Sequence, residues 1–255
     1  RLIEVEPRRT PLPHQIDAIA AWELAGRKGV FEHATGSGKT FTALTAVKKH
    51  ISAGASALIL VPSQLLLEQW ATEISEVLPD AVLLLAGAGN TKWRHPGRLA
   101  AMTGTLSDEP RVVLATMQTA ATSGFLESIE DGEHLMVVAD EVHQIGSTFN
   151  SRAMSIASGA SLGLSATPIR YGDPEGTARV FERFGPVVPP KITLQDAIRS
   201  GRLVDYEYHP HPVHLSAEEA DDWKRITYRI SLEVAKGRKD GSGQRFISDF
   251  AKLLL

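Results

Sequence analysis

Six short apolar segments recur along the chain, and their pattern constrains the fold more than any other feature. Each is apolar throughout instead of alternating with polar residues, as expected for parallel strands covered on both faces of a sheet. Longer segments with helical patterns separate them. The six segments are 29–33, 57–62, 81–87, 111–117, 135–140 and 162–167.

The helical patterns occupy the intervals between these segments. One helix is expected after Thr40 (FTALTAVKKHI), one over 65–78 (LLLEQWATEISEVL) and one over 149–158 (FNSRAMSIAS). Strands and helices in regular succession predict right-handed crossovers and a doubly wound, mainly parallel sheet. The expected fold class is therefore α/β.

Composition narrows the class of protein. The 255 residues are 43% hydrophobic, enough for a sizeable core, and the lack of cysteine excludes a disulfide framework and a thiolate metal site. No segment approaches the roughly 20 apolar residues of a membrane span, and 1–10 lacks the apolar run of a signal peptide. We expect a soluble protein without membrane partners, cytoplasmic in a bacterium or archaeon and nuclear in a eukaryote. The formal net charge of −3 argues against coating nucleic acid by bulk charge, but it allows a local basic groove.

The pattern changes after residue 170. The segment 171–190 is rich in glycine and proline and predicts an irregular excursion. A short helix is expected over 194–201, followed by an extended segment over 203–215. We therefore expect residues 1–205 to form one nearly complete α/β domain, and 206–255 to form a connector and the beginning of a second lobe or of a helical insertion.

A capping box marks the next helix. Ser216 is its N-cap, and Glu219 follows three residues later. The segment 237–244 (GRKDGSGQ) predicts a flexible, basic loop that is solvated rather than bound to phosphate, and a further helix is expected near Phe246. The N-terminal arginine and the apolar C-terminal residues indicate a piece of a longer polypeptide. One side of the helix after Ser216 carries Trp223, Ile226, Thr227, Ile230 and Val234.

The segment TGSGKT joins the first apolar segment to the first helix. Its glycines allow a tight turn in which backbone N–H groups and the positive end of the helix dipole face phosphate oxygens. Lys39 would add a positive charge at the β- and γ-phosphates, and the Thr40 hydroxyl would bind Mg²⁺. A plain turn with a solvated lysine is the alternative, but the order of strand, loop and helix favours phosphate binding. The residues expected to bind the nucleotide here are Thr35, Gly36, Ser37, Gly38, Lys39 and Thr40.

His33 stands where the common P-loop pattern has its first glycine. The positions that wrap the phosphates, Gly36 to Thr40, are all in place. The earlier position only has to lead the strand into the loop. We therefore expect His33 to be compatible with nucleotide binding.

An acidic pair follows the fifth apolar segment, in VVADEVHQ. Asp140 could hold a metal ion through water, and Glu141 could polarise the attacking water. Hydrolytic phosphoryl transfer needs both functions. An acidic strand end that caps a helix is the alternative, but the P-loop earlier in the chain favours a catalytic pair. Thr40 and Asp140 are thus the candidate Mg²⁺ ligands.

Three motifs, ATGSGKT, DEVH and LSATP, occur in the order and spacing that resemble superfamily 2 DExH-box helicases and translocases. The resemblance covers residues 10–210 and is greatest to the branch of restriction enzymes (ResIII and type I restriction motors) and XPB-like repair proteins. It implies the first RecA-like lobe of a P-loop NTPase, with ATP and Mg²⁺ as cofactors. It also assigns a catalytic role to His143, a residue type that is more often found in packing or at the surface. The implied catalytic set is Lys39, Asp140, Glu141 and His143.

The same resemblance implies roles for residues outside the P-loop and the acidic pair. Gln15, in PLPHQIDAI, would read the adenine edge; Leu12 stands where the branch often has an arginine, and a polar residue at a helix start is the alternative for Gln15. Leu66 and Trp70 are interpreted as helix core against the sheet. Pro62, Ser63, Thr116 and Gln118 would contact a nucleic-acid backbone, and Ser165, Ala166 and Thr167 would couple the nucleotide state to that groove unless they form a plain strand-to-loop turn.

Together these features predict an ATP-dependent DNA helicase or translocase motor in restriction, phage defence or repair. Contacts to DNA would be to the backbone, with little sequence preference. Further expected partners are a second RecA-like lobe of the same polypeptide and nuclease or specificity subunits. That lobe would supply arginine fingers, worth roughly 10³–10⁵ in rate, so we expect weak ATP binding and very slow hydrolysis without it. A DExH-type RNA helicase and a non-catalytic P-loop scaffold remain as alternatives.

Overall fold

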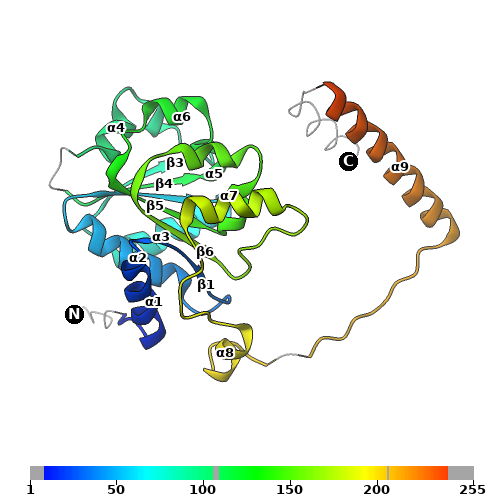
Figure 1. Ribbon diagram of the computed structural model, residues 1–255, viewed down its shortest axis with the longest axis horizontal. Helices are drawn as coiled ribbons and strands as arrows, with labels where there is room; N and C mark the ends of the chain where they lie inside the picture. The colour runs from blue at the N-terminus through cyan, green and yellow to red at the C-terminus, as the bar shows by residue number, and fades with distance from the viewer. Residues whose placement is uncertain (1–8, 106–108, 206, 241–255) are drawn as a thin grey trace, which may run out of the picture. The chain divides into compact units, whose positions relative to one another are not determined.

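The computed structural model describes residues 9–105, 109–205 and 207–240 (Figure 1). Contacts within the chain divide it into two units, Arg1–Asp205 and Tyr206–Leu255. Within the described residues, no helix is both long and apolar enough to cross a membrane.

The first unit is built on one parallel sheet of six strands in the order β1-β6-β5-β2-β4-β3. Each of the six predicted apolar segments overlaps one strand, and the predicted doubly wound α/β fold is confirmed. In β2 and β4 every residue is buried, which explains why these segments show no polar alternation. The strands are β1 (Lys28–Glu32), β2 (Ser56–Val61), β3 (Val82–Ala86), β4 (Arg111–Thr116), β5 (Gly132–Asp140) and β6 (Ser158–Ser165).

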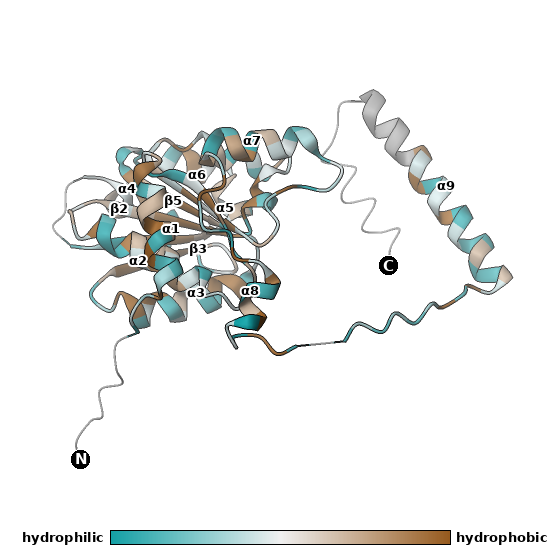
Figure 2. Cartoon of the chain, turned by 60° about the horizontal axis from the view of Figure 1, so that its bottom comes forward, coloured by the Kyte–Doolittle hydropathy of each residue, from teal (hydrophilic) through white to brown (hydrophobic). Residues whose placement is uncertain are grey.

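Helices cover both faces of this sheet and enclose one apolar cluster on each side. Figure 1 shows α1 and α2 across the strands from α4 and α6, and hydrophobic colour is concentrated on the strands in Figure 2. One cluster is covered by α1 (Pro13–Leu24), α2 (Lys39–Ile51) and α3 (Gln64–Val77). The other is covered by η1 (Lys92–Arg94), α4 (Arg98–Thr103), α5 (Met117–Ala120), α6 (Ser123–Ser128), η2 (Val142–Gly146), η3 (Asn150–Ser155) and α7 (Pro174–Phe184).

Two predictions for the first unit were wrong. The segment 149–158 was expected to be an α-helix, but β6 already begins at Ser158, and the residues before it form the short 3₁₀ turn η3. The segment 171–190 was expected to be irregular, but it contains α7. The Asp173 side chain caps this helix by accepting a hydrogen bond from Gly176 N at 2.8 Å, and Pro174 occupies the first turn, where its missing N–H costs nothing. The expected helix near residues 194–201 is confirmed as α8 (Leu194–Arg199).

The second unit contains α9 (Ala217–Asp240). The predicted capping box is confirmed, since Ser216 N donates to Glu219 Oε2 at 2.8 Å and Glu219 N donates to Ser216 Oγ at 3.3 Å. Residues 207–215 form neither helix nor strand. The helix continues through 237–240, where the sequence predicted a loop, so that prediction was wrong there; 241–244 and Phe246 lie outside the described residues.

Candidate active site

The carboxyl ends of all six strands lie at one edge of the sheet, because the strands are parallel. Ligands of open parallel sheets bind in the crevice outside these ends. Along this edge the P-loop follows β1, then come Ser165 at the end of β6 and Asp140 at the end of β5. Pro62 follows β2, and Thr116 ends the neighbouring β4. The predicted catalytic residues and the predicted nucleic-acid contacts therefore occupy adjacent parts of one edge.

Two glycines give the P-loop its backbone conformation. Gly36 and Gly38 have φ of 78° and 85°, in the left-handed region that favours glycine, and Gly38 is also the N-cap of α2. A Cβ atom at Gly38 would lie 2.5 Å from Gln15 Nε2. The loop therefore favours glycine at this position for its backbone angles, and a Cβ there would also displace the Gln15 amide from the Gly38 carbonyl oxygen. Thr35 and Gly36 are exposed, Ser37 is buried, and Lys39 and Thr40 are half-buried.

The Lys39 side chain lies back over the start of its own loop. Its Nζ donates a hydrogen bond to the His33 carbonyl oxygen at 3.0 Å. Burial lowers the pKa of Lys39, while the nearby charges of Glu141 and Asp140 oppose that shift. The lysine thus lies within electrostatic reach of both carboxylates of the DEVH motif.

His33 is a core residue beneath the P-loop. Its side chain is fully buried, stacks on Phe31 with ring centroids 5.3 Å apart, and has its Nε2 3.0 Å from the Pro190 carbonyl oxygen. Burial lowers its pKa from 6.5 to about 4, so the ring is neutral and Nε2 is the atom that donates to Pro190. A backbone bridge to Ile192 continues this contact. His33 therefore fixes the entry of the loop against the segment that follows α7.

Gln15 contacts the P-loop from the first turn of α1. Its Oε1 accepts a hydrogen bond from Leu12 N at 2.9 Å, and its Nε2 donates to Gly38 O at 3.2 Å. The side chain is buried. The neighbouring His14 places Nε2 3.1 Å from the Ser37 carbonyl oxygen. The amide of Gln15 thus supports the loop backbone, and its contact with adenine stays a prediction.

Both carboxylate oxygens of Asp140 have a donor. Oδ1 accepts a hydrogen bond from Glu141 N at 2.9 Å, and Oδ2 accepts one from the indole N–H of Trp70 at 2.7 Å. Asp140 is only 6% exposed. Its remaining lone pairs and the Thr40 hydroxyl fit Mg²⁺, which keeps several waters and uses one or two protein oxygens besides the phosphates. The described residues contain no cluster of three or more His, Asp or Glu side chains placed to hold a metal.

The DEVH and SATP motifs are joined through the Ser165 hydroxyl. Ser165 Oγ lies 3.4 Å from Glu141 Oε2 and 3.1 Å from His143 Nδ1, and it accepts a hydrogen bond from Thr167 N at 3.0 Å. His143 Nδ1 is 3.5 Å from the Glu141 carboxylate. Glu141 has φ of 45°, a conformation that non-glycine residues adopt rarely and often at functional sites. A displacement of either motif would therefore change the hydrogen bonds that surround the Glu141 carboxylate.

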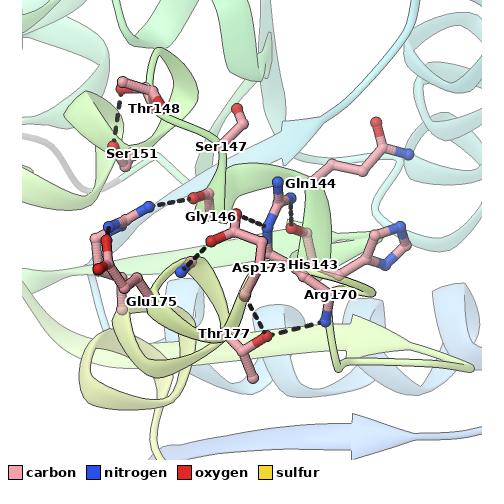
Figure 3. Close-up of polar contacts among 12 residues, drawn as sticks. His143, Gln144, Gly146, Ser147, Thr148, Ser151, Arg170, Asp173, Glu175 and Thr177 are labelled. Carbon is pink, nitrogen blue, oxygen red and sulfur yellow. Dashed lines mark hydrogen bonds and ion pairs between the residues drawn. The ribbon is translucent and has the colours of Figure 1, made fainter. Parts of the chain in front are cut away.

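Arg170 connects this cluster to α7 (Figure 3). Its Nη1 donates to the His143 carbonyl oxygen, and its Nε donates to Asp173 Oδ2 at 2.8 Å. Asp173, whose pKa is lowered by its hydrogen bond from Gly176 N and by Arg170, is the N-cap of α7. Arg170 was not predicted from the sequence. Its place two residues after SATP, beside the Asp-Pro start of a helix, was the available signal.

The four predicted nucleic-acid residues differ in exposure. Ser63 and Gln118 are exposed, Pro62 is half-buried, and Thr116 is buried. The Ser63 hydroxyl caps α3 by accepting a hydrogen bond from Leu66 N at 3.3 Å. The Thr116 hydroxyl donates to Thr119 Oγ1 at 2.8 Å and caps α5. Leu66 is partly buried and Trp70 fully buried against the sheet, so their interpretation as helix core is confirmed.

Comparison with known proteins decides the family. The family described as "Type III restriction enzyme, res subunit" (ResIII) matches residues 8–170. The chain belongs to the ResIII family. The match contains the P-loop, DEVH and SATP motifs and ends at Arg170. The resemblance to the restriction-enzyme branch of superfamily 2 is therefore confirmed.

Relatives of the ResIII chain are similar over the same region. "Putative DNA 3'-5' helicase Rad25" of Halobacterium salinarum is 35% identical over 163 residues, which are 64% of this chain and 24% of the relative. "Putative helicase 055L" of Frog virus 3 is 28% identical over 165 residues, which are 63% of this chain and 34% of the relative. The chain thus spans between 24% and 34% of the length of these curated relatives.

Solved structures share the fold of the ResIII chain. One is an ATP-dependent type ISP restriction-modification enzyme, LlaBIII, bound to DNA, with a TM-score of 0.60 and 16% identity over 78% of this chain and 16% of its own. Another is the UvsW helicase from bacteriophage T4, with a TM-score of 0.51 and 21% identity over 72% of this chain and 62% of its own. The fold of the first unit is accordingly that of a RecA-like helicase lobe.

Proposed function

We propose that this chain is the ATP-hydrolysing motor domain of a DNA helicase or translocase. The observation that carries the proposal is the contact of the Ser165 hydroxyl with both Glu141 and His143, beside Asp140 and within electrostatic reach of Lys39. Membership of the ResIII family and the names of the curated relatives support it.

Each group of residues in the site would have a separate role in ATP hydrolysis. The P-loop N–H groups and Lys39 would bind the phosphates, and Thr40 and Asp140 would hold Mg²⁺, Asp140 partly through water. When bound, Mg²⁺ neutralises phosphate charge. Glu141 would orient and deprotonate the attacking water, as a carboxylate within reach of a water can. His143 would hold the Glu141 carboxylate in place through Ser165.

The order of the strands also suggests how hydrolysis is coupled to DNA. The nucleotide would lie outside β1, β6 and β5, and the DNA backbone outside β2 and β4. Among the four predicted nucleic-acid residues, Ser63 and Gln118 are exposed at the ends of β2 and β4, where the DNA backbone would lie. Pro62 and Thr116 lie at the same strand ends. Ser165, Ala166 and Thr167 lie among the nucleotide-side groups, where they would pass on a change in nucleotide state.

The wider role of the protein is part of the same proposal. Residues 1–205 would be the first RecA-like lobe, and 206–255 a connector and the beginning of a second lobe or of an insertion. A second lobe would complete the site with arginine fingers, so the first lobe alone would hydrolyse ATP slowly. Restriction, phage defence and repair are the processes that fit such a motor, with nuclease or specificity subunits as partners.

Glu141→Gln in the whole protein tests the assignment of the base. The variant should bind ATP with Mg²⁺ while its turnover falls by roughly 10²–10⁴, the usual contribution of a general base. Glu182→Gln, on the exposed side of α7, is the matched control and should keep full turnover. Unchanged hydrolysis in Glu141→Gln would exclude Glu141 as the base. Failure of the unaltered protein to bind ATP would refute the proposed function itself.

A further inference from the structure

The single polar group of Trp70, its indole N–H, is hydrogen-bonded to a carboxylate. Its side chain is 1% exposed, and its indole N–H donates to Asp140 Oδ2 at 2.7 Å. A buried indole needs one acceptor, and a backbone carbonyl is sufficient, as Trp22 shows by donating to Ser161 O at 2.9 Å. The bond from Trp70 to an ionised carboxylate is of the stronger, charge-assisted kind.

This bond fixes the orientation of the Asp140 carboxylate. The Glu141 backbone N–H holds Oδ1 and Trp70 holds Oδ2, so rotation of the carboxylate about its terminal torsion would break both hydrogen bonds. Asp140 is buried at the end of β5, where water cannot freely replace a lost donor. The direction of its remaining lone pairs therefore depends on Trp70.

The same bond links Asp140 to the middle of α3. Trp70 lies two helical turns after Ser63, the N-cap of α3 at the proposed DNA side of the edge. The strand that leads into α3 is β2, which pairs directly with β5 through Leu60 and Ala139. Because a packed helix moves as a unit, a displacement at Ser63 would reach the indole.

We propose that Trp70 is a positioning residue. It orients the Asp140 carboxylate toward Mg²⁺, and it couples this orientation to the N-terminal end of α3 at Ser63, on the proposed DNA side. The inference rests on the proposed function, because it gives Asp140 its role toward Mg²⁺. A tryptophan that only fills the core would affect stability and leave the dependence on Mg²⁺ unchanged.

The test compares Trp70→Phe with Trp22→Phe in the whole protein. Both substitutions remove a fully buried indole N–H and keep an aromatic ring, so both should lower thermal stability. ATP hydrolysis is measured against Mg²⁺ concentration, with and without duplex DNA. Trp70→Phe should raise the Mg²⁺ concentration for half-maximal rate about 10-fold, as removal of an outer-shell partner does, and should reduce the stimulation by DNA. Trp22→Phe should leave both within about twofold of the unaltered protein.

Replacement of Trp70 by 3-benzothienylalanine keeps the inference testable if Trp70→Phe does not fold, because it keeps both rings and puts sulfur where the indole N–H was; it should raise the Mg²⁺ requirement as Trp70→Phe does. In a third variant, Trp70→His, the five-membered ring superposes on that of the indole, which puts Nε2 where the indole nitrogen was. It should recover much of the unaltered Mg²⁺ dependence at lower thermal stability. Equal Mg²⁺ dependence in Trp70→Phe and Trp22→Phe, or a histidine variant with no recovery, would overturn the inference. A titration with fluorescent ATP separates these results from failure of the proposed function, in which the unaltered protein would bind no nucleotide.

Discussion

Acid should destabilise this protein through His33, and His33→Gln should reduce that effect. The folded protein holds the imidazole neutral with a pKa of about 4, against 6.5 for an unburied histidine. Below pH 6.5 the unfolded chain therefore binds a proton that the folded chain does not. Stability rises with pH wherever the unfolded state binds more protons, so it falls as the pH drops from 6.5 towards 4.

The size of the effect follows from the same two pKa values. A shift of one unit corresponds to 1.36 kcal/mol, so the shift from 6.5 to about 4 is worth about 3.4 kcal/mol once both states are protonated. Between pH 7.5 and pH 5.0 the loss amounts to about 2 kcal/mol, because at pH 5.0 the unfolded histidine is charged and the folded one is still largely neutral. The charges of His14 and Lys39 add to the cost of protonating the ring.

Urea unfolding at pH 7.5 and pH 5.0, followed by circular dichroism, measures this loss. The His33→Gln variant would carry an amide that donates to the Pro190 carbonyl but does not titrate, so it should lose about 2 kcal/mol less than the unaltered protein. His50 is also buried with a lowered pKa, and comparing the two proteins cancels its contribution. Equal losses in the two proteins would refute the assignment of His33 as a buried neutral residue.

Three contacts around the site can be tested by substitution and urea unfolding. Gly38→Ala should cost about 1–2 kcal/mol, because it places a Cβ in the left-handed region against Gln15; unchanged stability would show that the loop has another conformation. Arg170→Gln should cost about 1–2 kcal/mol by freeing the His143 carbonyl, and Arg170→Lys should not restore it because lysine lacks the planar fork; full recovery would contradict the geometry. Thr116→Val should cost about 1 kcal/mol through loss of the α5 cap, and no loss would mean that the cap does not contribute.

The sheet was predictable because burial on both faces leaves a local trace. Strands such as β2 and β4 are buried at every residue, so their sequences are apolar without alternation. The P-loop and the DEVH motif were predictable for a similar reason, since each is a short continuous stretch of sequence at the carboxyl end of one strand. α7 was missed because the glycine and proline content of 171–190 outweighed the capping signal of Asp173 and Pro174.

The links between motifs could not be predicted from local patterns. Trp70 follows Leu65, Leu66 and Leu67 in an apolar helical pattern that indicates core, and its bond to Asp140 depends on β2 and β5 being neighbours in the sheet. The contact of Ser165 with Glu141 requires the pairing of β5 with β6. Such contacts join residues far apart in sequence, so they become visible only once the strand order is known.

The rate of ATP hydrolysis by the whole protein, measured with and without duplex DNA, decides whether this chain is a DNA-dependent motor. The proposed motor should hydrolyse ATP several times faster with duplex DNA, should respond far less to duplex RNA, and should lose the response in Glu141→Gln. A rate that duplex DNA leaves unchanged, or that RNA raises equally, would contradict the assignment of this chain as a DNA-dependent motor.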